Sequence, residues 1–371
     1  MKHLRLILIA WLLILLVSCS GGDTASLQGE TLFKLSIGKM EDQIDLFQYP
    51  GKPSAEKTRL FMKNGLFYIS NGNANKIMEF TSYGDILTLI YNPDQNPPPV
   101  TLTPSQKGES ASNRRAYPFP FKQVGEVAVM NEREIIVEDK LPDDRQVYDE
   151  KLGVILDSII VRFDKNGKMI DYLGQEGIGG TPFPYIERIE VNSRDEIIVF
   201  TRTVESWIVY WFSAGGVLLY TDTLSVSSLP LLGREGSIPS LDTVIADSSD
   251  PVLYLKIDYY GNTITRQSGT ETNIDFDRSR IYIRDVRRGV YTGSVEIPKV
   301  YIDRLEPGTF DEKRYEVLYE LLGVAKRDNF FLLAPKGNDS FELFIMNGKG
   351  ETVVRKRITL NEGDLVFRTF H

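Results

Sequence analysis

Apolar and polar residues alternate along most of the chain, in short runs separated by polar turns. Residues 126–137 and residues 188–199 align without a gap when the chain is shifted by 62 positions. Each copy reads as an alternating strand, a polar turn and a second strand of β-branched residues. Both copies follow a Pro-Phe-Pro-aromatic block, at residues 118–121 and 182–185. A repeated unit of β-strands is the economical explanation of this pattern.

The second half of the unit is a hairpin that recurs five times. Each copy has an apolar strand, a turn with a glycine and another alternating strand, and a strand of buried character precedes it. The turn glycines are Gly84, Gly167, Gly216, Gly289 and Gly350. The chain therefore contains five copies of a unit of about four strands.

A four-stranded antiparallel unit of about 40 to 50 residues, repeated several times, is typical of a β-propeller blade. Further strand-like segments remain at both ends, at residues 32–37 and 44–47 and at residues 365–370. Placing both ends in one shared blade closes the ring and buries the strand edges that an open array exposes. We therefore predict an all-β fold, a six-bladed β-propeller with a shared N/C-terminal closing blade, with five or seven blades as alternatives.

One segment departs from the strand pattern. Residues 310–322 begin with Asp311 and Glu312, and Leu318, Tyr319 and Leu322 follow at helical spacing. Acidic residues favour the first turn of a helix, and this spacing gives the helix one apolar face. The segment predicts one short helix packed on the rim of a blade.

The blade at residues 182–216 carries a family likeness. Its order is a proline, an alternating strand, an acidic turn, a second strand at residues 197–199, and Phe212 before the glycine turn. In this order it resembles the six-bladed propellers of the NHL and TolB-like families, and the resemblance covers most of the chain. A resemblance of this kind implies a fold and leaves the activity open.

The N-terminus reads as an export signal. Lys2 and Arg5 precede an unbroken apolar run at residues 6–17. A membrane-spanning helix needs about 20 apolar residues, so this shorter run favours a signal peptide over a retained anchor helix.

The run ends in Leu16-Val17-Ser18-Cys19, which resembles the lipobox of bacterial lipoproteins, and Cys19 is the only cysteine. The resemblance implies cleavage between Ser18 and Cys19 and lipid attachment to Cys19. The alternative is an ordinary secretory signal with a chance cysteine. We expect a signal peptide at residues 1–18, a flexible tether at residues 19–29 and a propeller domain at residues 30–371. With the propeller pattern, the whole resembles lipoproteins of spirochaete-type bacteria.

Charge and composition exclude several classes of function. Cleavage removes Lys2 and Arg5 and no acid, so the formal net charge changes from −8 to −10. An acidic body gives no support for binding nucleic acid or an anionic membrane surface. The cleaved chain has no second cysteine, and its only histidine is the last residue, His371. Disulfides, thiolate zinc sites and Cys/His catalysis therefore lack their residues, and we predict no catalytic residue and no cofactor.

The stretch Asp164-Lys165-Asn166-Gly167 raises the question of a calcium site. A calcium loop of the helix-flanked type has its glycine at position six, whereas here the glycine is fourth and apolar strands flank the loop. The residues three positions before the other turn glycines are Thr81, Ser213, Val286 and Asn347. This shared polar preference with a single carboxylate favours a turn that needs side-chain-to-backbone hydrogen bonds.

Asp275 and Asp277 are the candidates for a metal site. Residues two apart on a strand share a face, so both carboxylates can point the same way. Arg278, Arg280 and Arg284 follow closely and can neutralise them. We therefore favour a solvated, salt-bridged loop over a metal site.

The aromatic blocks offer candidates for an interface. Arg114, Arg115 and Tyr117 stand beside the first block, and aromatic residues and arginine often anchor protein interfaces. For Phe119 and Phe183 we favour packing between adjacent blades, because both recur at the start of a repeat.

These observations predict a lipid-anchored, non-enzymatic propeller in the bacterial cell envelope, on a periplasmic or outer-membrane face. Its partner would be another envelope protein or cell-wall material. One alternative is a metal-dependent propeller hydrolase of the lactonase type, with carboxylates and amides around a cation in the central channel. Another is a propeller that binds a small ligand in the channel.

Overall fold

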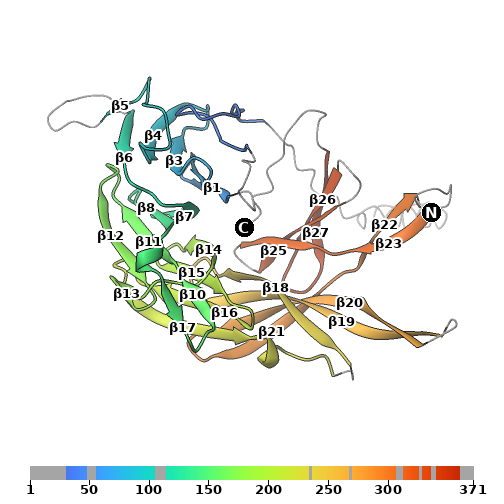
Figure 1. Ribbon diagram of the computed structural model, residues 1–371. Coiled ribbons are helices and arrows are strands. Elements are labelled where there is room, and N and C mark those ends of the chain that lie inside the picture. Colours follow the sequence, from blue (N-terminus) through green and yellow to red (C-terminus); the bar gives the residue numbers. More distant parts are fainter. Residues whose placement is uncertain are drawn as a thin grey trace, which may run out of the picture.

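The computed structural model describes residues 31–47, 56–104, 114–233, 236–266, 270–305, 312–325, 328–335 and 340–359. The fold is all-β, and the described residues contain five antiparallel sheets of at least four strands, which are the blades of a propeller (Figure 1). Apart from two short 3-10 turns, η1 (Asp143–Arg145) and η2 (Val226–Ser228), every regular element of the described residues is a strand.

The blades follow one another along the chain. Blade 1 contains β1 (Thr58–Lys63), β2 (Leu66–Asn71), β3 (Lys76–Phe80), β4 (Ile86–Tyr91), β5 (Thr103–Pro104) and β6 (Arg115–Pro118). Blade 2 contains β7 (Val124–Val129), β8 (Ile135–Lys140), β11 (Ser158–Phe163), β12 (Met169–Gly174) and β13 (Gly177–Ile178). Blade 1 is extended by β5 and β6, which pair in parallel, and blade 2 is extended by β13. Blade 3 contains β14 (Ile186–Val191), β15 (Ile197–Arg202), β16 (Ser206–Phe212) and β17 (Leu218–Ser225).

Blade 4 contains β18 (Ile238–Ala246), β19 (Val252–Arg266), β20 (Thr270–Asp285) and β21 (Val290–Ile297). Blade 5 contains β24 (Glu320–Ala325), β25 (Asn329–Pro335), β26 (Ser340–Met346) and β27 (Thr352–Thr359). Two smaller hairpins lie outside the blades: β9 (Val147–Asp149) with β10 (Val154–Leu156), and β22 (Val300–Leu305) with β23 (Glu312–Val317). The described part of the chain thus forms five blades, which is one of the alternatives that the sequence left open.

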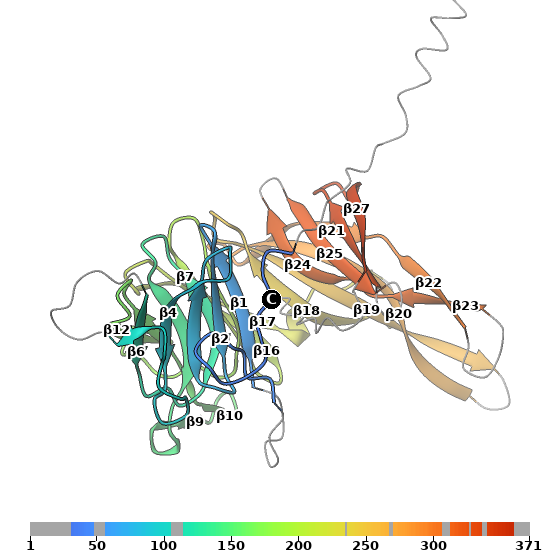
Figure 2. The same ribbon diagram turned by 90° about the horizontal axis from the view of Figure 1, so that it is seen from above.

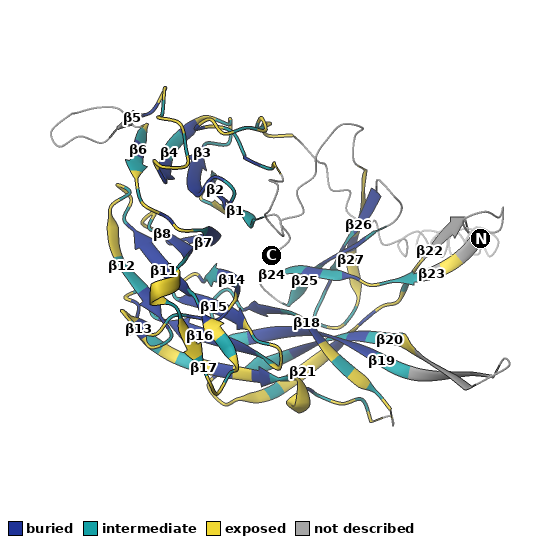
Figure 3. Cartoon of the chain, viewed as in Figure 1, coloured by how far each residue is buried: buried dark blue, intermediate teal, exposed yellow. Residues whose placement is uncertain are grey.

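The blades pack face to face because their middle strands are apolar on both sides. In β15, Ile197 and Val199 join the core between blades 2 and 3, whereas Ile198 and Phe200 join the core between blades 3 and 4. Similar cores lie between blades 1 and 2 and between blades 4 and 5. Figure 3 shows buried residues on the inner and middle strands and exposed residues on outer strands such as β17. Because successive side chains point to opposite faces, a continuous apolar run fills two cores at once.

The five turn glycines all adopt the left-handed backbone that the hairpins require. Their φ angles lie between 64° at Gly289 and 84° at Gly84. The strand pairing shifts by one residue just before each turn, as expected for a bulge next to a glycine. The inner turns repeat as well, because Arg133 and Asp195, which are 62 positions apart, have φ angles of 63° and 58°. The structure confirms the predicted repeat.

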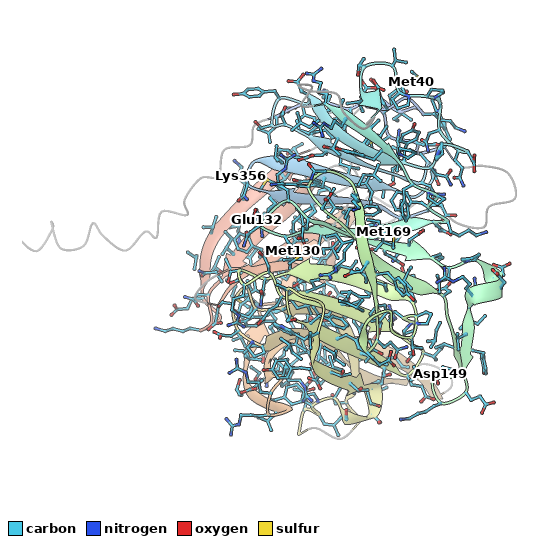
Figure 4. All side chains as sticks on the ribbon, turned by 90° about the vertical axis from the view of Figure 1, so that its left-hand side faces the viewer. Met40, Met130, Glu132, Asp149, Met169 and Lys356 are labelled. Carbon is cyan, nitrogen blue, oxygen red and sulfur yellow. The ribbon has the colours of Figure 1, made fainter. Side chains whose placement is uncertain are left out.

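The N-terminal segment covers blade 1 and does not form a strand of a closing blade. The ring of Phe33 lies 5.3 Å from that of Phe67 and 6.0 Å from that of Phe80. Leu35 and Ile44 pack against the same core, and Ile37 forms one isolated bridge with Ile44. This segment therefore buries the face of blade 1 that a further blade would cover. The predicted C-terminal contribution, residues 365–370, lies outside the described residues. Figure 4, in which Met40 marks this segment, shows the side chains that fill the spaces between sheets.

The helix predicted over residues 310–322 is wrong. Residues 312–317 form β23, which pairs with β22, and residues 320–325 form β24, the first strand of blade 5. Tyr319 and Leu321 are buried in the core between blades 4 and 5. The alternation of Tyr319 and Leu321 fits a strand, and pairing with neighbouring strands outweighs the local helical spacing.

Two hairpins extend beyond the blades on the same side of the molecule. They are the outer part of β19–β20 and the hairpin β22–β23, and both project on the right-hand side in Figures 1 and 2. In the described part of the chain, no helix has the length and apolar character needed to cross a membrane.

Candidate functional site

Several buried charged side chains lie near the propeller axis. The first strands of the blades are β1, β7, β14, β18 and β24; β7 contacts both β1 and β14, and β18 contacts β24. Charged side chains on or beside these strands are largely buried and belong to several groups: Glu126, Glu138, Arg188, Lys256 and Asp258. Burying a charge costs several kcal/mol unless it is paired. The partner of each buried charge therefore identifies the contact that the charge stabilises.

Lys57 connects three blades. Its Nζ donates to Glu138 Oε2 at 2.8 Å and lies 3.4 Å from Glu126 Oε1, both in blade 2. It also donates to the carbonyl oxygen of Ile186 in blade 3 and lies 4.4 Å above the ring of Tyr185. Arg59 Nε donates to Glu126 Oε1 at 2.7 Å. We call Lys57, Arg59, Glu126 and Glu138 the Lys57 cluster.

The electrostatics of the Lys57 cluster hold its lysine charged. Burial by itself lowers the pKa of Lys57, but Glu138 and Glu126 outweigh burial and raise the pKa above its ordinary value. The carboxylate of Glu138 also accepts a hydrogen bond from the Glu126 backbone nitrogen at 2.9 Å. Gly125 leaves room for it, since a Cβ there would lie 2.0 Å from Glu138 Oε2. The cluster therefore joins blades 1, 2 and 3.

Arg188 and Glu190 join blade 3 to blade 4. Arg188 Nη1 lies 3.1 Å from Glu190 Oε1 and 3.5 Å from the carbonyl oxygen of Val244. Glu190 Oε2 accepts from the backbone nitrogen of Ala246 at 3.1 Å. The pair thus satisfies backbone groups of β18 across the blade boundary.

Lys256 sits between two carboxylates inside blade 4. Its Nζ lies 2.8 Å from both carboxylate oxygens of Asp258 and 3.0 Å from Asp242 Oδ2. Asp258 also accepts a hydrogen bond from the hydroxyl of Ser279. The ammonium group occupies the place between these acids that a bound cation would need, so the site supplies its own cation.

A cavity of 320 Å³ opens where blades 3, 4 and 5 meet, and we call it the axial cavity. Its wall includes Glu187, Arg188, Trp207, Asp242, Lys256 and Tyr319. Arg188 also lines a second cavity of 250 Å³, which Phe61 of β1 borders. The volume of the axial cavity is in the range of small-molecule sites.

Local irregularities in the first strands place acids at this cavity. The pairing of β14 shifts by one residue at Glu187, and that of β18 shifts at Asp242. A bulge leaves its extra residue unpaired and changes the direction of its side chain. Both of these extra residues line the axial cavity. The sheets therefore supply two carboxylates to the cavity from two different blades.

Asp139 is a further acid with a shifted pKa, and its role is structural. Burial raises its pKa to about 6, despite hydrogen bonds from backbone nitrogens. Its Oδ1 accepts from the backbone nitrogens of Lys122 at 3.0 Å and Gln123 at 2.8 Å. Asp139 thus fixes the chain as it enters β7.

The hairpin residue Asp164 forms a turn. Its Oδ1 accepts from the backbone nitrogens of Asn166 and Lys168, each at 2.9 Å. In the other hairpins, Thr81, Ser213 and Asn347 accept from the backbone in the same way. The carboxylate of Asp164 does what a hydroxyl or an amide does elsewhere, which confirms the turn interpretation.

Asp275 and Asp277 lie in β20, in its part next to the projecting hairpin, and not in a loop. The pairing with β19 shifts at Asp277, which interrupts the alternation that would place both carboxylates on one face. Asp277 Oδ2 lies 3.3 Å from Arg278 Nε. Among the described residues, no three His, Cys, Asp or Glu side chains form a group that could hold a metal ion.

The candidate interface residues lie at the outer edge of blade 1, away from the axis. Arg114 Nη2 lies 3.1 Å from Asp85 Oδ1, with both side chains exposed. Arg115 and Tyr117 are in β6, and the Tyr117 ring covers Gly167 of blade 2. Their role in an interface stays a prediction. Ser18 and Cys19 lie outside the described residues, as do the signal peptide and the tether.

The aromatic residues of the two Pro-Phe-Pro blocks pack between blades, as favoured. The Phe119 ring lies 4.6 Å from that of Phe121 and 4.9 Å from that of Phe163. Phe183 is fully buried, 5.1 Å from the ring of Tyr210.

The sequence contained signals for the axial residues that the prediction missed. Lys256 and Asp258 interrupt the apolar first half of β19, residues 252–260, and charge inside a buried strand indicates a paired group. The 62-residue repeat aligns Glu126 with Arg188, so neighbouring blades place opposite charges at equivalent positions. Glu187 and Asp242 gave no such signal, because register shifts decide where they point.

Comparisons with known proteins identify no family for this chain. No protein-family model matches the sequence, and no curated protein matches it either. Similar solved structures include a polysaccharide lyase, an ulvan lyase, at 10% identity and a TM-score of 0.37, over 80% of this chain and 83% of that one. A member of the DUF4221 family from Bacteroides vulgatus has 10% identity and a TM-score of 0.37, over 81% and 76%. A Synechocystis apocarotenoid oxygenase has 9% identity and a TM-score of 0.33, over 84% and 63%. Likeness at this level carries no argument about function.

Proposed function

We propose that the protein is a lipid-anchored, non-enzymatic propeller that presents a rigid surface to another component of the bacterial cell envelope. The lipobox-like Leu16-Val17-Ser18-Cys19 supports the anchor, and the following small polar residues support a short tether. The partner is an envelope protein or cell-wall material.

The pairing of the axial charges carries this proposal. A general acid or base must be able to exchange its proton with a substrate, and a metal site needs carboxylates free to bind the ion. Here Glu138 is held by Lys57, Glu190 by Arg188 and Asp258 by Lys256. These ion pairs link neighbouring blades and hold strands of one blade together, which supports a structural role for the axial charges.

The two projecting hairpins supply a surface that the ring itself does not need. At the base of β19–β20, the ring of Tyr260 lies 6.0 Å from that of Phe276, and Lys299 Nζ lies 5.6 Å above Phe276. On β22–β23, the guanidinium of Arg314 lies 4.5 Å above the ring of Tyr301. Aromatic and basic residues on a projecting element are suited to protein recognition.

Affinity purification from detergent-solubilised membranes tests the proposal. The wild-type chain is expected to bring down one partner at a constant ratio. A Cys19→Ser variant is expected to move from the membrane fraction to the soluble fraction. A variant that stays in the membrane contradicts the anchor, and a wild-type chain that is repeatedly recovered as a lone monomer contradicts the docking role.

A further inference from the structure

The axial cavity lies at the end of the propeller that carries the additional strands. Its lining includes Glu187 and Trp207, near the starts of β14 and β16, and Glu320, at the start of β24. In an antiparallel blade the first and third strands begin at the same end. The hairpins β9–β10 and β22–β23 and the outer part of β19–β20 leave the blades at this end, whereas the five glycine turns lie at the other.

The lining of the axial cavity has more acidic than basic side chains. The acids are Glu187, Asp242, Asp258 and Glu320, and the bases are Arg188 and Lys256. Lys256 is shared between Asp242 and Asp258, so it neutralises one of these two acids. Arg188 pairs with Glu190, which is not part of the lining. The cavity therefore has an excess of negative charge, and charges in a partly buried site are screened less than charges on an open surface.

Two of these acids have carboxylate oxygens that a ligand can use. Glu187 is half-buried and makes no hydrogen bond or ion pair with the described residues. The side chain of Asp242 is 40% exposed, and its Oδ2 binds Lys256 and the hydroxyl of Thr243. Its Oδ1 accepts no hydrogen bond from the described residues. Acceptors without a donor are thus supplied from blade 3 and from blade 4.

The ligand that matches this lining is an organic cation. A metal ion needs several oxygen ligands directed at one point, and no three His, Cys, Asp or Glu side chains of the described residues form such a group. An ammonium or guanidinium group instead donates several hydrogen bonds to acceptors placed around it. Trp207, Leu318 and Leu321 form an apolar part of the wall, against which an aliphatic chain can pack.

We propose that the axial cavity binds a small organic cation, an amine or a guanidine on a short aliphatic chain. Its N–H groups donate to Glu187 and to Asp242 Oδ1, and its carbon chain packs against Trp207 and the two leucines. A volume of 320 Å³ is in the range of sites for molecules of this size. The inference goes beyond anchoring and docking and does not depend on them, so a failed purification of a partner and a failed titration overturn different claims.

Isothermal titration calorimetry on the full chain tests the inference. The probes are putrescine and agmatine, with 1,4-butanediol as the neutral comparison and succinate as the anionic one. At least one of the two cations is expected to bind with one-to-one stoichiometry at millimolar concentration or below, and its affinity is expected to fall when NaCl is raised from about 50 mM to about 500 mM. Absence of binding for both cations, or binding of butanediol as tight as that of putrescine, overturns the proposal.

A peptide probe distinguishes a free amine from the side chain of a partner protein. The peptide is acetyl-Gly-Lys-Gly-amide, in which the lysine ammonium group is the only charge. It is expected to bind more weakly than putrescine, because its backbone adds bulk that the cavity does not need to hold. Tighter binding of the peptide than of both free cations would overturn the assignment to a free ligand in favour of a lysine side chain from a partner.

Two variants locate the binding. Glu187→Gln keeps the shape of the side chain and is expected to weaken putrescine binding by about tenfold or more, because a hydrogen bond to a charged group is lost. Asp242→Asn is expected to weaken it as well, because an amide whose oxygen accepts from Lys256 turns its NH₂ group toward the ligand. Glu132→Gln, in the exposed turn between β7 and β8 (Figure 4), is the matched control and is expected to leave the affinity unchanged. Equal affinities for wild type, Glu187→Gln and Asp242→Asn, with unchanged melting temperatures of the free proteins, overturn the assignment of the site.

Discussion

Replacing Lys57 by methionine removes the cation that joins three blades. Methionine keeps much of the volume of the side chain and removes its charge. Arg59 still holds Glu126 at 2.7 Å, so the main consequence falls on Glu138, whose side chain is 2% exposed. Breaking a buried ion pair by removing one partner costs about 3 to 5 kcal/mol. Because Glu138 keeps its hydrogen bond from the Glu126 backbone nitrogen, we expect a loss of about 3 kcal/mol.

Urea unfolding, followed by the fluorescence of Trp207 and Trp211, measures these free energies. The double variant Lys57→Met, Glu138→Gln is expected to recover part of the loss, because no unpaired charge remains buried. Arg114→Met is the control, since the Arg114–Asp85 pair is exposed and its removal should cost less than about 0.5 kcal/mol. A Lys57→Met variant within about 1 kcal/mol of wild type at pH 8 would refute the reasoning.

Three further predictions follow from single residues. Asp139→Asn keeps the acceptor for the two backbone nitrogens and removes the charge. Because the folded pKa of about 6 exceeds the unfolded one, wild type loses stability as the pH rises through this range, and the variant should be more stable at pH 8 by up to about 3 kcal/mol. Urea unfolding at pH 4 and pH 8 checks this. A difference in unfolding free energy between variant and wild type that is equal at both pH values would contradict it. Asp164→Ala should cost about 1 kcal/mol through lost turn hydrogen bonds, and calcium should leave the melting temperature of wild type and variant unchanged. A calcium-dependent rise in the melting temperature of wild type that is absent in the variant would favour a calcium site instead of a turn. Phe183→Ala should cost about 3 to 5 kcal/mol through the cavity it leaves, whereas Tyr83→Ala, at an exposed position, should change stability by less than about 0.5 kcal/mol. Similar losses for both in urea unfolding would show that Phe183 is not a core residue.

The repeat could be predicted because local chemistry determines it. A hairpin turn needs a glycine at positive φ, and Gly84, Gly167, Gly216, Gly289 and Gly350 each provide one. A strand buried on both faces must be apolar along its length, as residues 197–200 are. Such features can be read from the sequence because each depends on the residue type at a single position.

The place of the N-terminal segment and the axial cavity could not be predicted in the same way. Phe33 packs on the core of blade 1, and nothing in the pattern of residues 32–37 distinguishes a covering segment from a strand. Glu187 and Asp242 reach the cavity through register shifts, which depend on the pairing of whole strands. The local spacing of residues 310–322 predicts a helix at Tyr319, because it does not reveal the strands that pair next to this residue.

Crosslinking in intact cells, followed by mass spectrometry, tests the central claim that this propeller docks to an envelope component. We predict reproducible crosslinks from the projecting hairpins, β19–β20 and β22–β23, to one envelope partner, and loss of those crosslinks in a Cys19→Ser variant. Crosslinks confined to the chain itself, in wild-type cells with the protein in the membrane fraction, would contradict the proposed role.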